Sequence, residues 1–340
     1  MQTSTRLLLV SGIVAVAVLG LIDLGYGRYA EKHFIPNMTL HKAEAAGTRC
    51  LVTLGDSRMA AGIDGPALTD ALRAETVETC VAQLAIGALP ISGQAMALRR
   101  LVHDGRFPRW VVLGASAGTL LDEDSPDPSE LFGNRAAELA WSDSSDIYRY
   151  YPGFPFMDLD RGVRFWFARS NALTTYASAT WIKTQSLQER LVGNRPETQR
   201  NRFGALDDMR ALSASFRDRA LQALAASNGG YRLNRWFELV QSLVHDSGAR
   251  LIVLEVPMDA SYRREVLDSV GGRKYRQWLE SQLARSGDAF LDMSAPTSIH
   301  DQNFADGIHL DAGGAKAFSR ELGKELASLL SSSAPLPQAQ

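Results

Sequence analysis

The residues best suited to chemistry are a serine near the start of the chain and an Asp–His pair near its end. Ser57 closes a Gly-Asp-Ser turn directly after the apolar run 51–54. Asp306 and His309 lie three residues apart with a glycine between them, so a single turn can point both side chains the same way. A serine nucleophile needs a base within hydrogen-bonding distance, and the base needs a carboxylate that orients it. These three residues therefore suit nucleophilic acyl chemistry.

The remaining histidines are less suited to act as that base. His300 lies in the same loop as His309 but has no acid in a comparably constrained turn. Four others lie in a polar segment before the first strand or at the ends of helices expected away from the site: His33, His41, His103 and His245.

The Gly-Asp-Ser turn also permits a plain structural interpretation, because these residue types are common in strand-to-helix turns.

A repeated pattern of an apolar strand followed by a loop of small residues positions these groups. The pattern predicts strands at 51–54, 76–84, 109–113, 250–256 and 289–292, and helices at 59–74, 94–103, 233–246, 272–286 and 315–330. It indicates an α/β fold of the flavodoxin-like, three-layer type, with a parallel sheet of about five strands. The carboxyl edge of such a sheet is where these folds place their chemistry. Ser57 would lie there, close to the backbone N–H groups of a helix start.

Together these motifs resemble the SGNH (GDSL-type) hydrolase superfamily. The Gly-Asp-Ser turn matches its serine block, and Asp306-x-x-His309 matches its final block. The resemblance covers roughly residues 48–120 and 230–330. It implies that Ser57 is the nucleophile, that His309 is the base and that Asp306 orients the base.

The same resemblance implies an oxyanion hole. Its donors would be the backbone N–H of Ser57, that of Gly87 after the second strand, and a third group after the third strand. The family has Asn at this third position in a G-x-N block, whereas this chain has Ser116. A hydroxyl can also donate a hydrogen bond, so Ser116 is the expected third donor.

A narrower resemblance concerns the ending 304–319 together with the apolar N-terminus. It is similar to membrane-tethered members of the superfamily, among them the D-alanyl transfer protein of teichoic acid modification and the alginate O-acetylation proteins. The resemblance implies an extracytoplasmic serine acyl-ester hydrolase or O-acyltransferase with an acyl-Ser57 intermediate. Its substrate would be an acylated envelope glycan or a small ester, and a membrane-bound O-acyltransferase would be its partner. The alternative is a non-catalytic partner with the same fold, which Ser116 and the long insertion favour.

The N-terminus has the composition of a membrane segment. Residues 7–22 are uncharged after Arg6, and Asp23 is the next charge before Arg28. This length just suffices to cross a bilayer, so we expect residues 1–28 to be an uncleaved anchor, with a cleaved signal peptide as the alternative. A stalk at 29–47, the α/β domain at 48–330 on the far side of the membrane, in the periplasm or outside, and a disordered tail at 331–340 would follow.

Residues 121–229 interrupt the strand–helix pattern. The segment is acidic and proline-rich at first and aromatic later. We interpret it as a mainly helical insertion that covers the active edge of the sheet and shapes a cleft. Its aromatic residues could stack on sugar rings, although aromatic residues more often belong to a core.

Composition and cysteine placement limit the other classes of function. The formal net charge is -2 without a basic stripe, which argues against nucleic-acid binding. His309 has no second His or Cys at ligand spacing, so neither a metal nor another cofactor is expected. Cys50 and Cys80 each lie seven residues before a predicted site residue and would sit on neighbouring strands. They could form a disulfide in an oxidising compartment, but two buried thiols are the favoured alternative because disulfide geometry is demanding.

Overall fold

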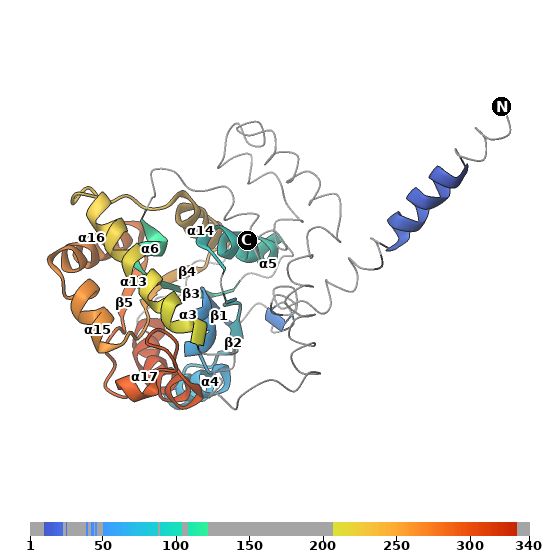
Figure 1. Cartoon of the computed structure of the whole chain (residues 1–340). Coiled ribbons are helices and arrows are strands. Elements are labelled where there is room, and N and C mark those ends of the chain that lie inside the picture. The colour runs from blue at the N-terminus through green and yellow to red at the C-terminus, as the bar shows by residue number, and fades with distance from the viewer. Residues whose placement is uncertain are drawn as a thin grey trace.

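The computed structural model describes residues 10–22, 50–87, 89–103, 108–121 and 207–331, with a few positions between 25 and 45. These residues contain a five-stranded parallel sheet between helices (Figure 1). The strands are β1 (Leu51–Leu54), β2 (Val81–Gln83), β3 (Trp110–Ala115), β4 (Arg250–Glu255) and β5 (Ala289–Asp292). Their order, β2-β1-β3-β4-β5, is the flavodoxin-like order of doubly wound folds and confirms the predicted fold class.

Helices cover both faces of the sheet. They are α3 (Ser57–Gly62), α4 (Gly65–Ala74), α5 (Ile91–His103), α6 (Ala117–Leu120), α13 (Asp207–Ala226), α14 (Arg235–Asp246), α15 (Ala260–Tyr262), α16 (Val270–Ser286) and α17 (Ala312–Ser331). Short π-helical and 3-10 turns occupy Arg263–Leu267 and Asp301–Asn303. In Figure 1, α4 and α17 lie on one side of the sheet and α5 and α14 on the other.

The side chains of each strand alternate between the two faces of the sheet, and this alternation produces one apolar core on each face. Successive strand side chains point to opposite faces, so Val111 joins the core beneath α5, α14 and α16, whereas Val112 joins the core beneath α4 and α17. Both valines are fully buried, and so is Phe318 of α17. A strand that is apolar throughout is therefore explained by burial on both faces.

Several element boundaries differ from the predicted ones for local reasons. The second strand is three residues long instead of spanning 76–84, because Thr76 has a positive φ of 64° that turns the chain after α4. Helix α16 begins at Val270, earlier than predicted, because Ser269 caps it and Gly272 fits its first turn. A Cβ on Gly272 would lie 2.0 Å from the Val266 carbonyl oxygen, so this close approach requires glycine.

The insertion is described at its two ends. Residues 122–206 lie outside the described residues, and with them most of the predicted cleft cover and its aromatic side chains. Leu121 forms an antiparallel bridge with Leu233, and the Asn234 N–H donates to the Leu120 carbonyl at 2.8 Å. The chain thus leaves and re-enters the α/β domain at one point. The final part, α13, is helical as expected.

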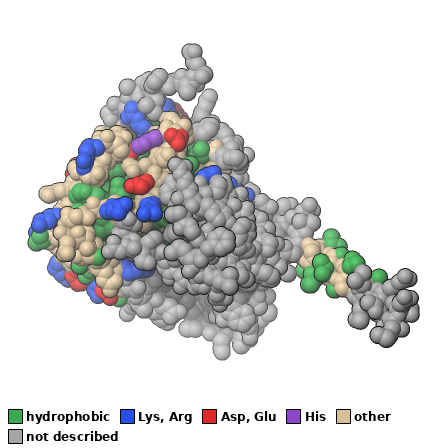
Figure 2. Space-filling view, turned by 90° about the horizontal axis from the view of Figure 1, so that it is seen from above, with side chains coloured by type: hydrophobic (Ala, Val, Ile, Leu, Met, Phe, Trp, Pro, Cys, Tyr) green, Lys and Arg blue, Asp and Glu red, His purple; other side chains and the backbone are tan. Residues whose placement is uncertain are grey.

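Residues 10–22 form a helix with an exposed apolar surface. Figure 2 shows hydrophobic side chains gathered along it, and those most exposed are Val10, Ile13, Val14, Val16, Val18, Leu19, Leu21 and Ile22. Among the helices that the structure describes, none is both long and apolar enough to span a membrane. The predicted anchor also includes residues 1–9, 23–24 and 26–28, which lie outside the described residues, so the anchor stays a prediction.

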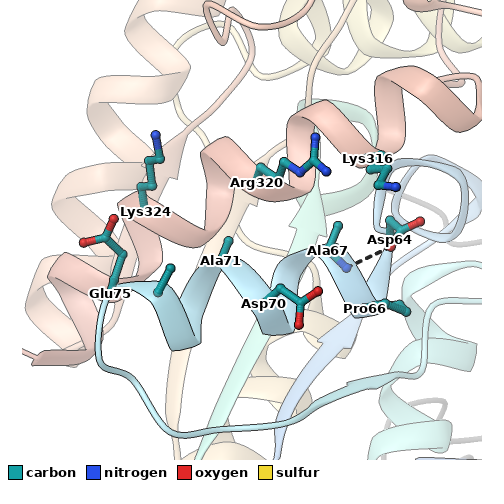
Figure 3. A pocket seen from close by; sticks show the side chains of 10 residues that line it. Asp64, Pro66, Ala67, Asp70, Ala71, Glu75, Lys316, Arg320 and Lys324 are labelled. Carbon is teal, nitrogen blue, oxygen red and sulfur yellow. Dashed lines mark hydrogen bonds between the residues drawn. The ribbon is translucent and has the colours of Figure 1, made fainter.

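A charged groove of about 580 Å³ separates the exposed sides of α4 and α17. The two helices run side by side and touch closely at Gly323, where a Cβ would lie 2.5 Å from the Ala71 Cβ. Figure 3 shows acidic side chains along α4 and its caps and basic side chains along α17: Asp64, Asp70, Glu75, Lys316, Arg320 and Lys324. The groove contains none of the three residues predicted to act in acyl chemistry.

Cys50 and Cys80 form a disulfide. Leu51 pairs in register with Val81, so the cysteines that precede them lie side by side with their Cα atoms 4.4 Å apart. The favoured interpretation of two buried thiols is therefore wrong. Parallel pairing in register provides the close approach that a disulfide needs.

We expect removal of this disulfide to destabilise the domain. It closes a loop with a sequence separation of 30, for which the chain-entropy model gives about 3–4 kcal/mol. A Cys50→Ala, Cys80→Ala variant should show this loss in denaturant-induced unfolding. Reductant should shift the unfolding midpoint of the wild type and leave that of the variant unmoved; a wild type insensitive to reductant would contradict the prediction.

Candidate active site

The structure brings Ser57, His309 and Asp306 into one hydrogen-bonded chain. The His309 Nε2 atom lies 2.8 Å from the Ser57 Oγ. The His309 Nδ1 atom lies 2.8 Å from Oδ2 and 3.0 Å from Oδ1 of Asp306. A sequence distance of 252 residues separates the serine from the histidine. The arrangement is that of a serine nucleophile, a base and an orienting carboxylate.

The serine turn depends on tight packing at the carboxyl ends of β1 and β3. Asp56 caps α3, which makes Ser57 the first residue of that helix. The Met59 side chain fills the space beneath the turn, so a Cβ on Gly55 would lie 2.5 Å from the Met59 Cγ and a Cβ on Gly114 only 1.9 Å. Gly55 also has a φ of 155°. Both positions therefore require glycine for Ser57 to stand at this edge.

The Asp306–His309 turn is buried and internally hydrogen-bonded. Asp306 Oδ1 accepts the backbone N–H groups of Ile308 and His309 at 3.1 and 2.8 Å, and Gly307 adopts a φ of 81°. Burial by itself would raise the pKa of Asp306, but hydrogen bonds from the ring and backbone of His309 and the charge of that ring lower it below its ordinary value. Asp306 thus remains a carboxylate that orients the ring.

The predicted oxyanion donors lie at the same edge of the sheet. The Ile86 N–H donates to the Gly55 carbonyl at 3.0 Å, which places the loop containing buried Gly87 beside the serine turn. Ser116 follows β3 and is 1% exposed. Its backbone N–H donates to Thr119 Oγ1 at 2.9 Å, and the two hydroxyl oxygens are 3.4 Å apart. The oxyanion roles of Ser57, Gly87 and Ser116 stay predictions.

The other described histidines lie outside this arrangement. His245 Nε2 contacts Asp288 Oδ1 at 2.8 Å at the end of α14, and the backbone N–H of His300 donates to Asn303 at 2.9 Å. His33 and His41 fall outside the described residues, as does the side chain of His103. In the described part of the chain, no group of three or more His, Cys, Asp or Glu side chains could hold a metal ion.

Arg58 is a site residue that sequence reasoning missed. Its guanidinium donates to the Asp56 carboxylate through Nε and Nη2 at 3.0–3.2 Å, and its side chain is 2% exposed. Burial by itself would lower the pKa of Arg58, but the Asp56 carboxylate raises it above its ordinary value. The guanidinium therefore stays charged beside the serine. The available signal was an arginine directly after the serine at the start of a buried helix.

Glu255 is a second missed residue. It ends β4, pairs in register with Ala115 of β3, and is 2% exposed. Burial raises its pKa from 4.5 to about 8, with a further increase from Asp292 and opposing effects of Arg58 and Arg276. A single acid at the end of the apolar run 251–254 was the sequence signal.

Comparison with known proteins adds little to this geometry. The chain matches no family model and no curated protein. Among solved structures it is similar to the lipase/acylhydrolase from Enterococcus faecalis, with 14% sequence identity over 85% of this chain and 99% of that chain, and a TM-score of 0.35. A likeness this weak assigns no activity. The fold and site themselves define a flavodoxin-like α/β protein with a Ser–His–Asp arrangement at the carboxyl edge of its sheet.

The raised pKa of Glu255 predicts a specific pH dependence of stability. Between 4.5 and about 8 the folded protein keeps a proton that the unfolded chain has lost, so this group lowers the unfolding free energy as pH rises through that window. The slope approaches about 1.4 kcal/mol per pH unit. A Glu255→Gln variant should lack this decline.

The measurement is denaturant unfolding of the wild type, the Glu255→Gln variant and a Glu265→Gln control at several pH values. Glu265 is exposed, so its variant should follow the wild type. Parallel curves for the wild type and Glu255→Gln would show that Glu255 ionises normally in the folded protein.

Proposed function

We propose that the protein is a serine acyl-ester hydrolase or O-acyltransferase that works through an acyl-Ser57 intermediate. The observation that supports this function is the hydrogen-bonded chain from Asp306 through His309 to Ser57, with contacts of 2.8 Å on each side of the imidazole. Nucleophile, base and orienting acid are thus within the distances that acyl transfer requires.

The mechanism follows from these contacts. His309 Nε2 takes the proton of Ser57 Oγ as that oxygen attacks the ester carbonyl, and Asp306 stabilises the resulting imidazolium. Backbone N–H groups at the start of α3 and in the loop of Gly87, with Ser116, would hold the oxyanion. His309 then gives its proton to the departing alkoxide, which leaves the acyl group on Ser57. The acceptor, either water or a sugar hydroxyl, then gives its proton to His309 and attacks the acyl-serine. The acyl group passes to the acceptor, and His309 returns the proton to Ser57.

The acceptor decides between the two activities. Water gives hydrolysis, and a sugar hydroxyl gives transfer; both use the same three residues. We propose an acylated envelope glycan or a small ester as substrate, with a membrane-bound O-acyltransferase as partner. The exposed apolar helix 10–22 supports a membrane location, and the Cys50–Cys80 disulfide supports an oxidising compartment outside the cytoplasm.

The second candidate function is that of a non-catalytic partner of a membrane-bound O-acyltransferase. It is favoured by Ser116, whose backbone N–H is already bonded to Thr119 and whose hydroxyl lies 3.4 Å from the hydroxyl of Thr119. If Ser116 does not donate to the oxyanion, transition-state stabilisation falls by about 2.7–4 kcal/mol. Such a protein would retain the fold and bind its partner without forming an acyl-enzyme.

A serine-directed fluorophosphonate distinguishes the two functions. We expect the full chain to gain one adduct on Ser57 and to hydrolyse an aryl ester, and the Ser57→Ala variant to do neither. His309→Ala should also fail to react, whereas His300→Ala, which changes the other histidine of the same loop, should react normally. Intact-protein mass spectrometry measures the adduct, and circular dichroism checks folding. A folded wild-type protein without an adduct would favour the non-catalytic partner.

The orienting role of Asp306 gives a separate prediction. Asp306→Asn keeps the shape of the turn but presents an amide to His309 Nδ1, which favours the wrong tautomer of the ring. By analogy with the serine-protease arrangement, we expect kcat for an aryl ester to fall by about 10⁴-fold. Steady-state kinetics on folded variant protein tests this expectation, and a rate within about tenfold of wild type would argue against the role.

A further inference from the structure

The two residues that flank Ser57 are bonded to each other. The Arg58 backbone N–H donates to Asp56 Oδ1 at 2.9 Å, and its guanidinium donates to both oxygens of the same carboxylate at 3.0–3.2 Å. Ser57 lies between these residues in the chain. One carboxylate therefore holds the backbone N–H and the guanidinium of the residue that follows the serine to the residue that precedes it.

The other side of the Arg58 guanidinium faces a buried polar cluster. The guanidinium carbon lies 4.4 Å from the centre of the Phe216 ring, and that ring stacks on Tyr262 with their centres 5.9 Å apart. Three buried atoms of the cluster have no hydrogen-bond partner among the described residues: Arg58 Nη1, Glu255 Oε1 and the Tyr262 hydroxyl. The Arg58 charge and the Glu255 carboxyl group thus act on each other electrostatically, while no hydrogen bond of the described residues joins the Arg58 Nη1 atom to the Glu255 Oε1 atom.

Stability does not explain this cluster. Unpaired polar atoms in the protein interior cost free energy, and buried ion pairs can usually be replaced by apolar side chains without loss. Such arrangements concentrate at functional sites, and this one adjoins the proposed nucleophile. Three separate elements contribute its polar groups: Arg58 belongs to α3, Glu255 to β4 and Tyr262 to α15.

We infer that Arg58 is a positioning residue for Ser57 and that the charge of Glu255 controls how firmly Arg58 is held. The inference rests on the proposed function, in which Ser57 is the nucleophile. While Glu255 is neutral, Asp56 retains the guanidinium and keeps the serine aligned. When Glu255 ionises, a second carboxylate attracts the unpaired Nη1 side of the guanidinium and weakens the Asp56–Arg58 contact.

The groups around Glu255 set the pH at which this happens. Arg58 approaches it from α3, Asp292 from the end of β5 and Arg276 from α16. Tyr262 and Tyr275 complete the surroundings, and burial together with nearby Glu255 raises the pKa of both hydroxyls, so they stay neutral in the same range. Arg276 is itself bonded to Asp292 at 2.6 Å. Glu255 therefore changes charge near pH 8.

The test is the rate of fluorophosphonate labelling of the full chain between about pH 6 and about pH 10, followed by intact mass at a temperature where each protein is folded. We expect the wild-type rate to decline above about pH 8, approaching about tenfold per pH unit. Glu255→Gln should lose this decline, and the matched Glu265→Gln control should keep it. Arg58→Lys retains the charge but not the two-point contact, so it should label about tenfold to a hundredfold more slowly.

Each outcome bears on the inference separately from the proposed function. A wild type that never labels overturns the proposed function and this inference with it. A wild type that labels but shows the same pH profile as Glu255→Gln overturns only the control by Glu255. Arg58→Lys labelling at the wild-type rate overturns the positioning role. If Arg58→Lys does not fold, the comparison of Glu255→Gln with Glu265→Gln still decides whether the cluster acts on Ser57.

Discussion

The packing of Met59 beneath the serine turn is the constraint on which the site depends. β1 must end and α3 must begin within two residues, and the Met59 side chain occupies the volume that side chains at Gly55 and Gly114 would need. Because β1 and β3 are neighbours, the packing of Met59 against Gly55 and Gly114 sets both the position of the serine turn above the sheet and its distance from β3. Ser57, Asp56 and Arg58 take their positions from it.

The second half of the site reaches the serine through helix packing. His309 precedes α17, and α17 packs along α3 and α4 on one face of the sheet. Ser319 of α17 accepts the Asp64 N–H at 2.8 Å, close to the end of α3. The helix that follows His309 thus packs on the same face of the sheet as the helix that carries Ser57. The Asp306–His309 turn then sets the orientation of the imidazole ring.

Buried charge collects at the carboxyl edge of the sheet. Asp306 and His309 are hydrogen-bonded to each other, and the Asp56 carboxylate accepts from the Arg58 guanidinium. Among the described residues, one oxygen of Glu255 has no hydrogen-bond partner, and this group remains protonated to about pH 8. Elsewhere in the two cores the buried side chains are mostly apolar. A domain stabilised by two apolar cores can tolerate the free-energy cost of these buried charged and unpaired groups at one edge of its sheet, and the proposed chemistry lies at that edge.

The sequence by itself determined the order of strands and helices, the Ser57–His309–Asp306 set and the edge of the sheet where these residues meet. Apolar runs, turn residues and short motifs are local patterns, and doubly wound connectivity then leaves few arrangements. The tertiary structure alone decided the Cys50–Cys80 bond, which depends on strand register, and the cluster of Arg58 with Glu255. Whether an arginine and a glutamate almost two hundred positions apart come near each other depends on which strands are neighbours and how deeply each side chain is buried, and neither quantity has a local sequence pattern.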